Sequence, residues 1–188
     1  MRGVKMIDLK LLKHSQSYAI EMSKLTSDNR VKDALGLSDE QASLRGTKEF
    51  IDFVLAQEME QKQLSRVILN ESNQLIGVIT LKSIDKEKKT AHIGTWIGAP
   101  YWGKGYNQLA KEKMLNIAFK DLHLEYVFAG ATIQNIRSQK AQMKLPYMII
   151  DVGSQFPGEL RKIQIQTKSK CILNMITKDS FFRTYDNL

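Results

Sequence analysis

Residues 100–107 combine types that can bind an anionic ligand, in the order Pro-Tyr-Trp-Gly-Lys-Gly-Tyr-Asn. Gly103 and Gly105 let the backbone turn sharply and approach a ligand closely, because neither has a Cβ. A helix predicted from residue 106 would begin with amides that lack intrahelical partners and with the positive end of its dipole. Lys104 adds a positive charge, so the loop suits a pyrophosphate. Gly-x-Gly also occurs in plain strand-to-helix turns, and that alternative stays open.

Two common nucleotide-binding motifs do not fit this loop. A Walker A loop requires Ser or Thr after Gly-Lys, whereas Gly105 follows Lys104. A dinucleotide-binding fingerprint requires a third glycine at position 108, which is Gln108, and it follows the first strand of a parallel unit. The sequence before this loop predicts an antiparallel meander instead.

The elements that would position the loop follow from the spacing of apolar residues. Alternation predicts a strand near 3–12, and helical spacing follows over 15–25. Ser38 and Gln41 fit a capping box for a short helix, and Thr47 is predicted to cap a longer helix that ends at about Gln63. Gly36 and Gly46 are interpreted as helix breakers in the polar segment 28–46.

The rest of the sequence, from residue 66 onward, predicts a mixed sheet. Strands over 66–69, 75–81 and 91–98 are separated by polar turns and form the meander. The elements expected after it are a helix at 106–120, a strand at 124–132, a helix at 134–144, and strands at 146–152 and 171–177. A helix that joins two strands makes a crossover, so strands 91–98 and 124–132 should be parallel. The sequence therefore predicts one mixed α/β domain over residues 1–188, with helices on both faces of the sheet.

Composition excludes several other classes of protein. The 188 residues are 43% hydrophobic and 26% charged, as in an ordinary globular chain, which argues against disorder, a collagen-like chain and a coiled coil. The single cysteine, Cys171, excludes an internal disulfide framework and a cysteine-built zinc site, and no base is paired with it in the sequence. The three histidines are too far apart for a local metal motif, so no metal site is predicted.

The charge distribution favours an anionic partner. Of the formal net charge of +8, most lies in residues 104–188, which carry 13 Lys or Arg against 7 Asp or Glu. Nucleic acid, an acidic peptide and a phosphorylated cofactor all fit this balance. No basic run is interleaved with aromatic residues, so direct binding of nucleic acid is not expected. No segment approaches the ~20 apolar residues of a membrane span, and lysines interrupt the N-terminus, so we expect no membrane association and a cytoplasmic location.

Three short motifs occur in order behind the meander. They are Ile93-Gly94-Thr95-Trp96-Ile97, the run from Tyr101 to Tyr106, and Asn135-Ile136-Arg137-Ser138. Together with the element order, they resemble the GNAT-type N-acetyltransferases, and most closely the branch that acetylates N-terminal alanine and serine of ribosomal proteins. The resemblance implies a GNAT-like central sheet, mixed and mostly antiparallel, with a splayed pair of parallel strands.

The resemblance also implies an activity. It is transfer of an acetyl group from acetyl-CoA, as cosubstrate and without a metal, to a primary amine by direct attack in a ternary complex. A protein or peptide N-terminus is the expected acceptor. A polyamine, an amino sugar or an amino acid remains an alternative, as does a CoA-binding regulatory module without turnover. The oligomeric state is left open, with a homodimer as one option.

The resemblance also implies roles for individual residues, according to their positions in the three motifs. The loop amides would bind the phosphates, Trp96 and Ile97 would lie where the strand backbone pairs with the pantetheine arm, and Asn135 would contact the cofactor near the thioester. Ser138 matches a hydroxyl proposed to protonate the leaving thiolate. The residues expected to bind cofactor are Trp96, Ile97, Trp102, Gly103, Lys104, Gly105, Tyr106, Asn107 and Asn135.

A purely structural role remains an alternative interpretation for each of these residues. His92, with a reference pKa of about 6.5, is a candidate base, or else a half-buried strand residue. Trp96 can be a core residue only, Asn135 a helix cap and Ser138 a surface residue.

Several positions depart from the family pattern. Trp102 stands where the wider family has Arg or Gln, and Asn107 stands where it has Gly or Ala and could crowd the phosphates. Gln142 replaces a tyrosine that serves many relatives as the acid, and His92 replaces a glutamate of this branch. The helix end Lys-Leu-Pro-Tyr at 144–147 replaces Lys-x-Gly-Phe. Cofactor binding is still expected, while the assignment of acid and base stays open.

Overall fold

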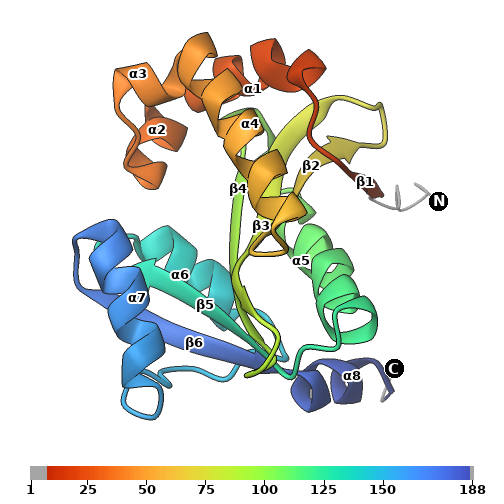
Figure 1. The fold of residues 1–188 in the computed structure, drawn as a ribbon, viewed down its shortest axis with the longest axis vertical. Coiled ribbons are helices and arrows are strands. Elements are labelled where there is room, and N and C mark those ends of the chain that lie inside the picture. The colour runs from red at the N-terminus through yellow and green to blue at the C-terminus, as the bar shows by residue number, and fades with distance from the viewer. Residues whose placement is uncertain (1–7, 187–188) are drawn as a thin grey trace, which may run out of the picture. The chain divides into compact units, whose positions relative to one another are not determined.

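The computed structural model describes residues 8–186, shown with labelled elements in Figure 1. The described chain forms two compact units. The first contains the residues up to Thr80 together with Thr95–Met114, and the second contains Leu81–Gly94 and the residues from Leu115 onward. A single domain over residues 1–188 stays a prediction.

The strands of the described chain form a six-stranded sheet in the order β1-β2-β3-β4-β5-β6, in which β3 spans Leu75–Asp85. Strand β1 (Leu9–Leu12) is antiparallel to β2 (Leu64–Asn70), and β5 (Tyr126–Thr132) is antiparallel to β6 (Cys171–Thr177). Strand β4 (Thr90–Ile97) is parallel to β5, with Thr90–His92 in register with Tyr126–Phe128. Beyond these paired residues, β4 continues to Ile97 and β5 to Thr132. The predicted mixed sheet, mostly antiparallel with one parallel pair, is therefore confirmed.

The first unit carries the N-terminal helices. Its helical elements are η1 (Gln16–Tyr18), α1 (Ala19–Thr26), α2 (Asn29–Leu35), α3 (Asp39–Ala42), α4 (Leu44–Met59), η2 (Ala99–Tyr101) and most of α5 (Tyr106–Asn116). The predicted capping box of Ser38 and Gln41 is present at α3. Helices α1 and α4 pack on the strands through a core of Ala19, Met22, Ile51, Val67, Leu69, Leu75 and Val78.

The start of α4 corrects two predictions. Its N-cap is Ser43, whose hydroxyl accepts from the Gly46 amide at 3.1 Å, whereas Thr47 lies buried within the helix. Gly46 is also helical and does not break the helix. A Cβ there would lie 2.3 Å from the Glu40 carbonyl oxygen, so close packing of α3 on α4 requires a glycine.

The second unit contains elements that the sequence did not reveal. The predicted strand 146–152 is wrong, because only an isolated bridge joins Ile149 to Met175 and Asp151 adopts a positive φ of 55°. The chain instead enters helix α7 (Pro157–Thr167), and after β6 it forms helix α8 (Lys178–Asp186). The predicted helix at 134–144 is α6 (Ile136–Met143), and a π-helical turn, η3 (Ile117–Asp121), follows α5.

Helix α7 packs on β5 and β6. The core there contains Phe128, Val152, Ile163, Leu173 and Met175. A Cβ at Gly130 of β5 would lie 2.4 Å from Ile163 Cδ1, so the small residue lets α7 approach the sheet. Over the described residues, no helix is both long and apolar enough to cross a bilayer.

Candidate active site

The first unit holds the Gly-Lys-Gly loop at the end of β4. The Gly98 amide donates to the Ile76 carbonyl at 2.7 Å, and η2 then turns the chain away from the strand. The indole Nε1 of Trp102 donates to the Ile97 carbonyl at 2.6 Å. The Arg30 guanidinium lies 5.7 Å from the centre of the Trp102 ring. Trp102 thus anchors the loop to the strand end through its side chain.

The loop backbone is shaped for an anion. Gly103 and Gly105 have positive φ values of 74° and 84°, which favour glycine over residues with a Cβ. Both are exposed, and a Cβ at Gly103 would meet nothing within 4 Å, so the surface there is open. The Leu109 amide donates to the Gly105 carbonyl at 3.2 Å, so the amides before it precede the first i→i−4 bond of α5. This arrangement fits a pyrophosphate.

Two side chains of the loop have distinct positions. Lys104 is exposed, with its Nζ 5.5 Å from the centre of the Tyr101 ring. Tyr106 is buried, and its hydroxyl donates to Glu71 Oε2 at 2.8 Å. Burial, followed by Glu71, raises the pKa of Tyr106 above its usual value. Tyr106 is therefore a neutral donor, which leaves its backbone amide as the group it can offer a phosphate.

A buried lysine behind the loop was missed by sequence reasoning. The Lys111 Nζ donates to Asn107 Oδ1 one helical turn away. Burial lowers the pKa of Lys111 to about 8. The side-chain oxygen of Asn107, expected as a possible obstruction to phosphates, is thus engaged by Lys111. The i,i+4 spacing was the available signal.

The two strand residues of this unit have packing roles. Trp96 is half-buried and packs against the core cluster of the first unit, and Ile97 is buried. The interpretation of Trp96 as a core residue therefore has direct support. Pairing of the strand backbone with the pantetheine arm stays a prediction.

The second unit holds Asn135 and Ser138 together at the start of α6. Asn135 is the N-cap, and its Oδ1 accepts from the Ser138 amide at 3.0 Å. Ser138 is half-buried, and its hydroxyl oxygen accepts from Gln142 Nε2 at 3.3 Å. The expected cap role of Asn135 is therefore present, and contact with a cofactor stays a prediction.

Gln142, at the position of the family's tyrosine, belongs to a buried network. Its Nε2 also donates to the Gly130 carbonyl at 3.2 Å, and its Oε1 accepts from Asn174 Nδ2 at 2.7 Å. Asn174 Oδ1 in turn accepts from the Asp151 amide at 2.9 Å. Gln142 connects β5, α6 and β6, and its amide cannot act as a proton donor in catalysis.

His92 is buried and pairs with the half-buried Glu159, a contact that the sequence did not reveal. His92 Nε2 lies 2.7 Å from Glu159 Oε2, and Lys162 Nζ donates to both oxygens of Glu159 at 2.8 and 2.9 Å. Burial lowers the pKa of His92, while Glu159 opposes that shift. The bonds from Lys162 and His92 outweigh desolvation and lower the pKa of Glu159.

An ionised Glu159 and a neutral His92 place the imidazole proton on Nε2. Nδ1 is then the basic nitrogen; it is buried and has no hydrogen-bond partner in the structure.

The phenol of Tyr147 and the thiol of Cys171 both contact neighbouring residues of the second unit. Tyr147 is fully buried and packs edge-to-face on Phe181 with 5.2 Å between ring centres. Cys171 is half-buried, with its Sγ 3.2 Å from Thr167 Oγ1.

The family follows from comparison with known sequences. The sequence model described as acetyltransferase (GNAT) domain matches residues 8–147, well over half of the chain. The chain belongs to the GNAT acetyltransferase family. The resemblance to this family that was inferred from the sequence motifs is confirmed. The matched region of this GNAT chain ends before α7, so Glu159 and Lys162 lie outside it.

Two curated relatives match part of this GNAT chain. The N-acetyltransferase p20 of Bacillus licheniformis, which is uncharacterised, is 31% identical over 81 residues, or 43% of this chain and 46% of that protein. YdaF of Bacillus subtilis, provisionally named a ribosomal N-acetyltransferase, is 31% identical over 74 residues, or 39% of this chain and 40% of that protein. The chain thus spans less than half the length of these relatives.

A solved structure extends the likeness in fold. The microcin C7 self-immunity acetyltransferase MccE, in complex with acetyl-CoA and AMP, is similar with a TM-score of 0.69. The similarity covers 91% of this chain and 92% of that one at 20% identity. At that identity, the comparison supports the GNAT fold and leaves the substrate open.

Proposed function

We propose that this chain is an N-acetyltransferase that moves an acetyl group from acetyl-CoA to a primary amine by direct attack in a ternary complex. The observation that carries the proposal is the open loop with Gly103 and Gly105 at the start of α5, in a chain of the GNAT family. Acetyl-CoA supplies the acetyl group as a thioester. A cytoplasmic location stays a prediction from the sequence, as does the option of a homodimer.

The loop residues would hold the cofactor's phosphates. The amides around Gly103 and Gly105 and the first amides of α5 offer donors, and the helix dipole favours negative charge there. Lys104 is exposed beside them, and Lys111 adds a buried positive charge one turn further on. Donors fixed by a folded backbone need no rearrangement when the ligand binds, which favours positioning.

His92 is proposed to take the proton from the attacking amine, directly or through a water. Its neutral form at pH 7 is supported by the lowered pKa, and Glu159 fixes the tautomer with Nδ1 as the basic nitrogen. Ser138 is proposed to donate a proton to the leaving thiolate, since its hydroxyl is held at the start of α6 by Gln142. Asn135 orders that turn as its cap.

A protein or peptide N-terminus is the acceptor that we propose. The ribosomal name of the Bacillus subtilis relative supports it, as do the sequence motifs of the same branch. A polyamine, an amino sugar and an amino acid are the competing acceptors.

A CoA-binding module without turnover is the second candidate function. The observation that favours it is Gln142, because a buried amide in a structural network stands where many relatives have the acidic tyrosine.

Two measurements on one preparation separate these functions. Acetyl-CoA is expected to raise the melting temperature, since a ligand that binds the native state stabilises it by mass action. Release of free thiol from acetyl-CoA is then followed with a panel of peptides, polyamines, amino sugars and amino acids. Stabilisation with thiol release supports the enzyme, and stabilisation without release across the panel supports the binding module. Absence of both effects would overturn both candidates.

A further inference from the structure

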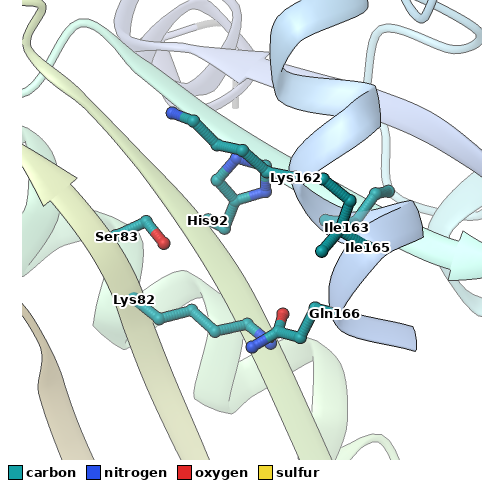
Figure 2. A pocket seen from close by; sticks show the side chains of 7 residues that line it. All are labelled: Lys82, Ser83, His92, Lys162, Ile163, Ile165 and Gln166. Carbon is teal, nitrogen blue, oxygen red and sulfur yellow. The ribbon is translucent and has the colours of Figure 1, made fainter. Parts of the chain in front are cut away.

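A cavity of about 180 Å³ lies within the second unit, beside His92. Figure 2 shows its walls: Lys82 and Ser83 come from β3 (Leu75–Asp85), His92 from β4, and the other side chains from α7. The α7 residues are Lys162, Ile163, Ile165 and Gln166. This volume is below the ~300–1,000 Å³ of sites that take a whole small-molecule ligand, so the cavity suits one functional group of a larger ligand.

The charges around the cavity do not cancel. Lys162 is matched by Glu159, whose two oxygens it contacts at 2.8 and 2.9 Å. Lys82 Nζ instead donates to a neutral amide oxygen, Gln166 Oε1, at 3.1 Å. His92 adds no charge at neutral pH, because burial lowers its pKa. The walls therefore carry one positive charge in excess, on Lys82.

The surroundings of Lys82 strengthen the attraction of this excess charge for an anion. Burial lowers the pKa of Lys82, as expected for an ammonium without a nearby carboxylate. The apolar part of the lining is the buried Ile163 together with Ile165, which is largely exposed, and an electrostatic contact is stronger than in water on the side that Ile163 covers. An anion in the cavity would compensate Lys82, whereas a second cation would be repelled.

We propose that this cavity binds an anionic group, a carboxylate or a phosphate, carried by the acceptor amine. The assignment of that anion to the acceptor rests on the proposed acetyltransferase function. It makes the substrate class an amine with a nearby negative charge, such as an N-terminus followed by an acidic residue or a small amine with its own carboxylate or phosphate. Polyamines are disfavoured, because every added amine brings a positive charge toward Lys82.

The first test measures acceptor selectivity. Three peptides with a common N-terminal serine and Glu, Gln or Lys in second place are compared by kcat/KM. Free glutamate against glutamine, and phosphoethanolamine against ethanolamine, distinguish a small acceptor from a peptide, and spermidine is the polycation. The anionic member of an accepted pair is expected to be favoured about tenfold or more, the range of one charge-assisted hydrogen bond.

Variants of Lys82 assign that preference to the cavity. Lys82→Met keeps the length of the side chain and should abolish the preference, and Lys82→Glu should reverse it toward the lysine peptide or spermidine. Lys170→Met is the matched control, because Lys170 is an exposed lysine of the same unit. Melting temperature and the acetyl-CoA-induced shift verify that each variant is folded. A preference that persists in Lys82→Met would overturn the proposal.

A binding measurement separates this inference from the enzymatic proposal. Glutarate and inorganic phosphate are titrated into the protein while the imidazole nitrogen resonances of His92 are followed by NMR. Saturable shifts that are lost in Lys82→Met and kept in Lys170→Met would support the anion site even if thiol release is absent. Turnover with no charge preference, or no saturable shift with either anion, would overturn the site while leaving the acetyltransferase proposal standing.

Discussion

Glu159 Oε2 lies 2.7 Å from His92 Nε2, although 67 residues separate the two in the chain. The contact joins α7 to β4 within the second unit, and Lys162 donates to both oxygens of the same carboxylate. Because a carboxylate on Nε2 orients the ring and favours the imidazolium, Glu159 is a positioning residue in the proposed mechanism.

Glu159→Gln tests that positioning role through the pH profile. Glu159 raises the pKa of His92 against the lowering effect of burial, so loss of its charge should lower that pKa further. The acid limb of kcat/KM should move to lower pH, and the plateau should fall because the base is weaker. Glu87→Gln, an exposed glutamate of the same unit, is the control. An acid limb that stays in place would show that His92 is not the base.

Gly105→Glu is expected to abolish the rise in melting temperature that acetyl-CoA causes. The substitution forces a Cβ into a positive φ and brings a negative charge to the proposed phosphate site. Gly36→Glu is the matched control, because Gly36 is also exposed with a positive φ of 65°, and a Cβ there would meet nothing within 4 Å. If the shift survives in Gly105→Glu, the loop is not the cofactor site.

Ser138→Ala should lower kcat and leave the affinity for acetyl-CoA nearly unchanged, because only the transition state loses the interaction. General acids contribute ~100- to 10,000-fold, and a thiolate leaves readily, so we expect a loss of about 100-fold or less. Ser154→Ala, at an exposed serine of the same unit, is the control. Full kcat in Ser138→Ala would transfer the acid role to a water, since Tyr147 is fully buried in the core.

Asn107→Ala should destabilise the fold by about 1–3 kcal/mol, because it removes a partner of the buried Lys111 ammonium. Adding Lys111→Met removes the buried charge itself, so the double variant should be more stable than the sum of the two single effects predicts. Urea unfolding of the four proteins gives the coupling free energy. Additive costs would mean that the two side chains do not interact.

Acid should destabilise the fold through His14. This ring is buried, lies 2.9 Å from Ser65 Oγ and has its pKa lowered to about 4, mainly by burial. Between pH 6.5 and about 4 the unfolded chain binds a proton at His14 that the native state does not bind. The contribution of His14 to the free energy of unfolding is therefore complete above pH 6.5 and falls with acidification. Over this pH window the free energy of unfolding should fall by about 3 kcal/mol, at 1.36 kcal/mol per pH unit.

His14→Gln should remove this part of the acid sensitivity. Urea unfolding at about pH 7 and about pH 4.5 measures it in both proteins, and the carboxylates common to both cancel in the comparison. An equal loss in the two proteins would show that His14 takes up its proton normally in the native state.

The sequence by itself determined the features that depend on neighbouring residues. The capping box of Ser38 and Gln41 lies within four residues, and the positive φ values of Gly103 and Gly105 are conformations that glycine adopts without steric cost. The crossover from β4 through α5 to β5 also followed from the order of elements, because parallel neighbouring strands need a long crossover connection and a single helix supplies one here.

Tertiary structure alone decided which groups surround the candidate base. Nothing in the spacing of His92, Glu159 and Lys82 shows that they share one region, because α7 reaches them only by packing on β5 and β6 over Gly130. The sequence predicts a strand over 146–152, yet the positive φ of Asp151 and the bond from its amide to Asn174 turn the chain toward α7. Local propensity specifies a segment, whereas burial and long-range hydrogen bonds determine which segments meet, and these depend on the whole fold.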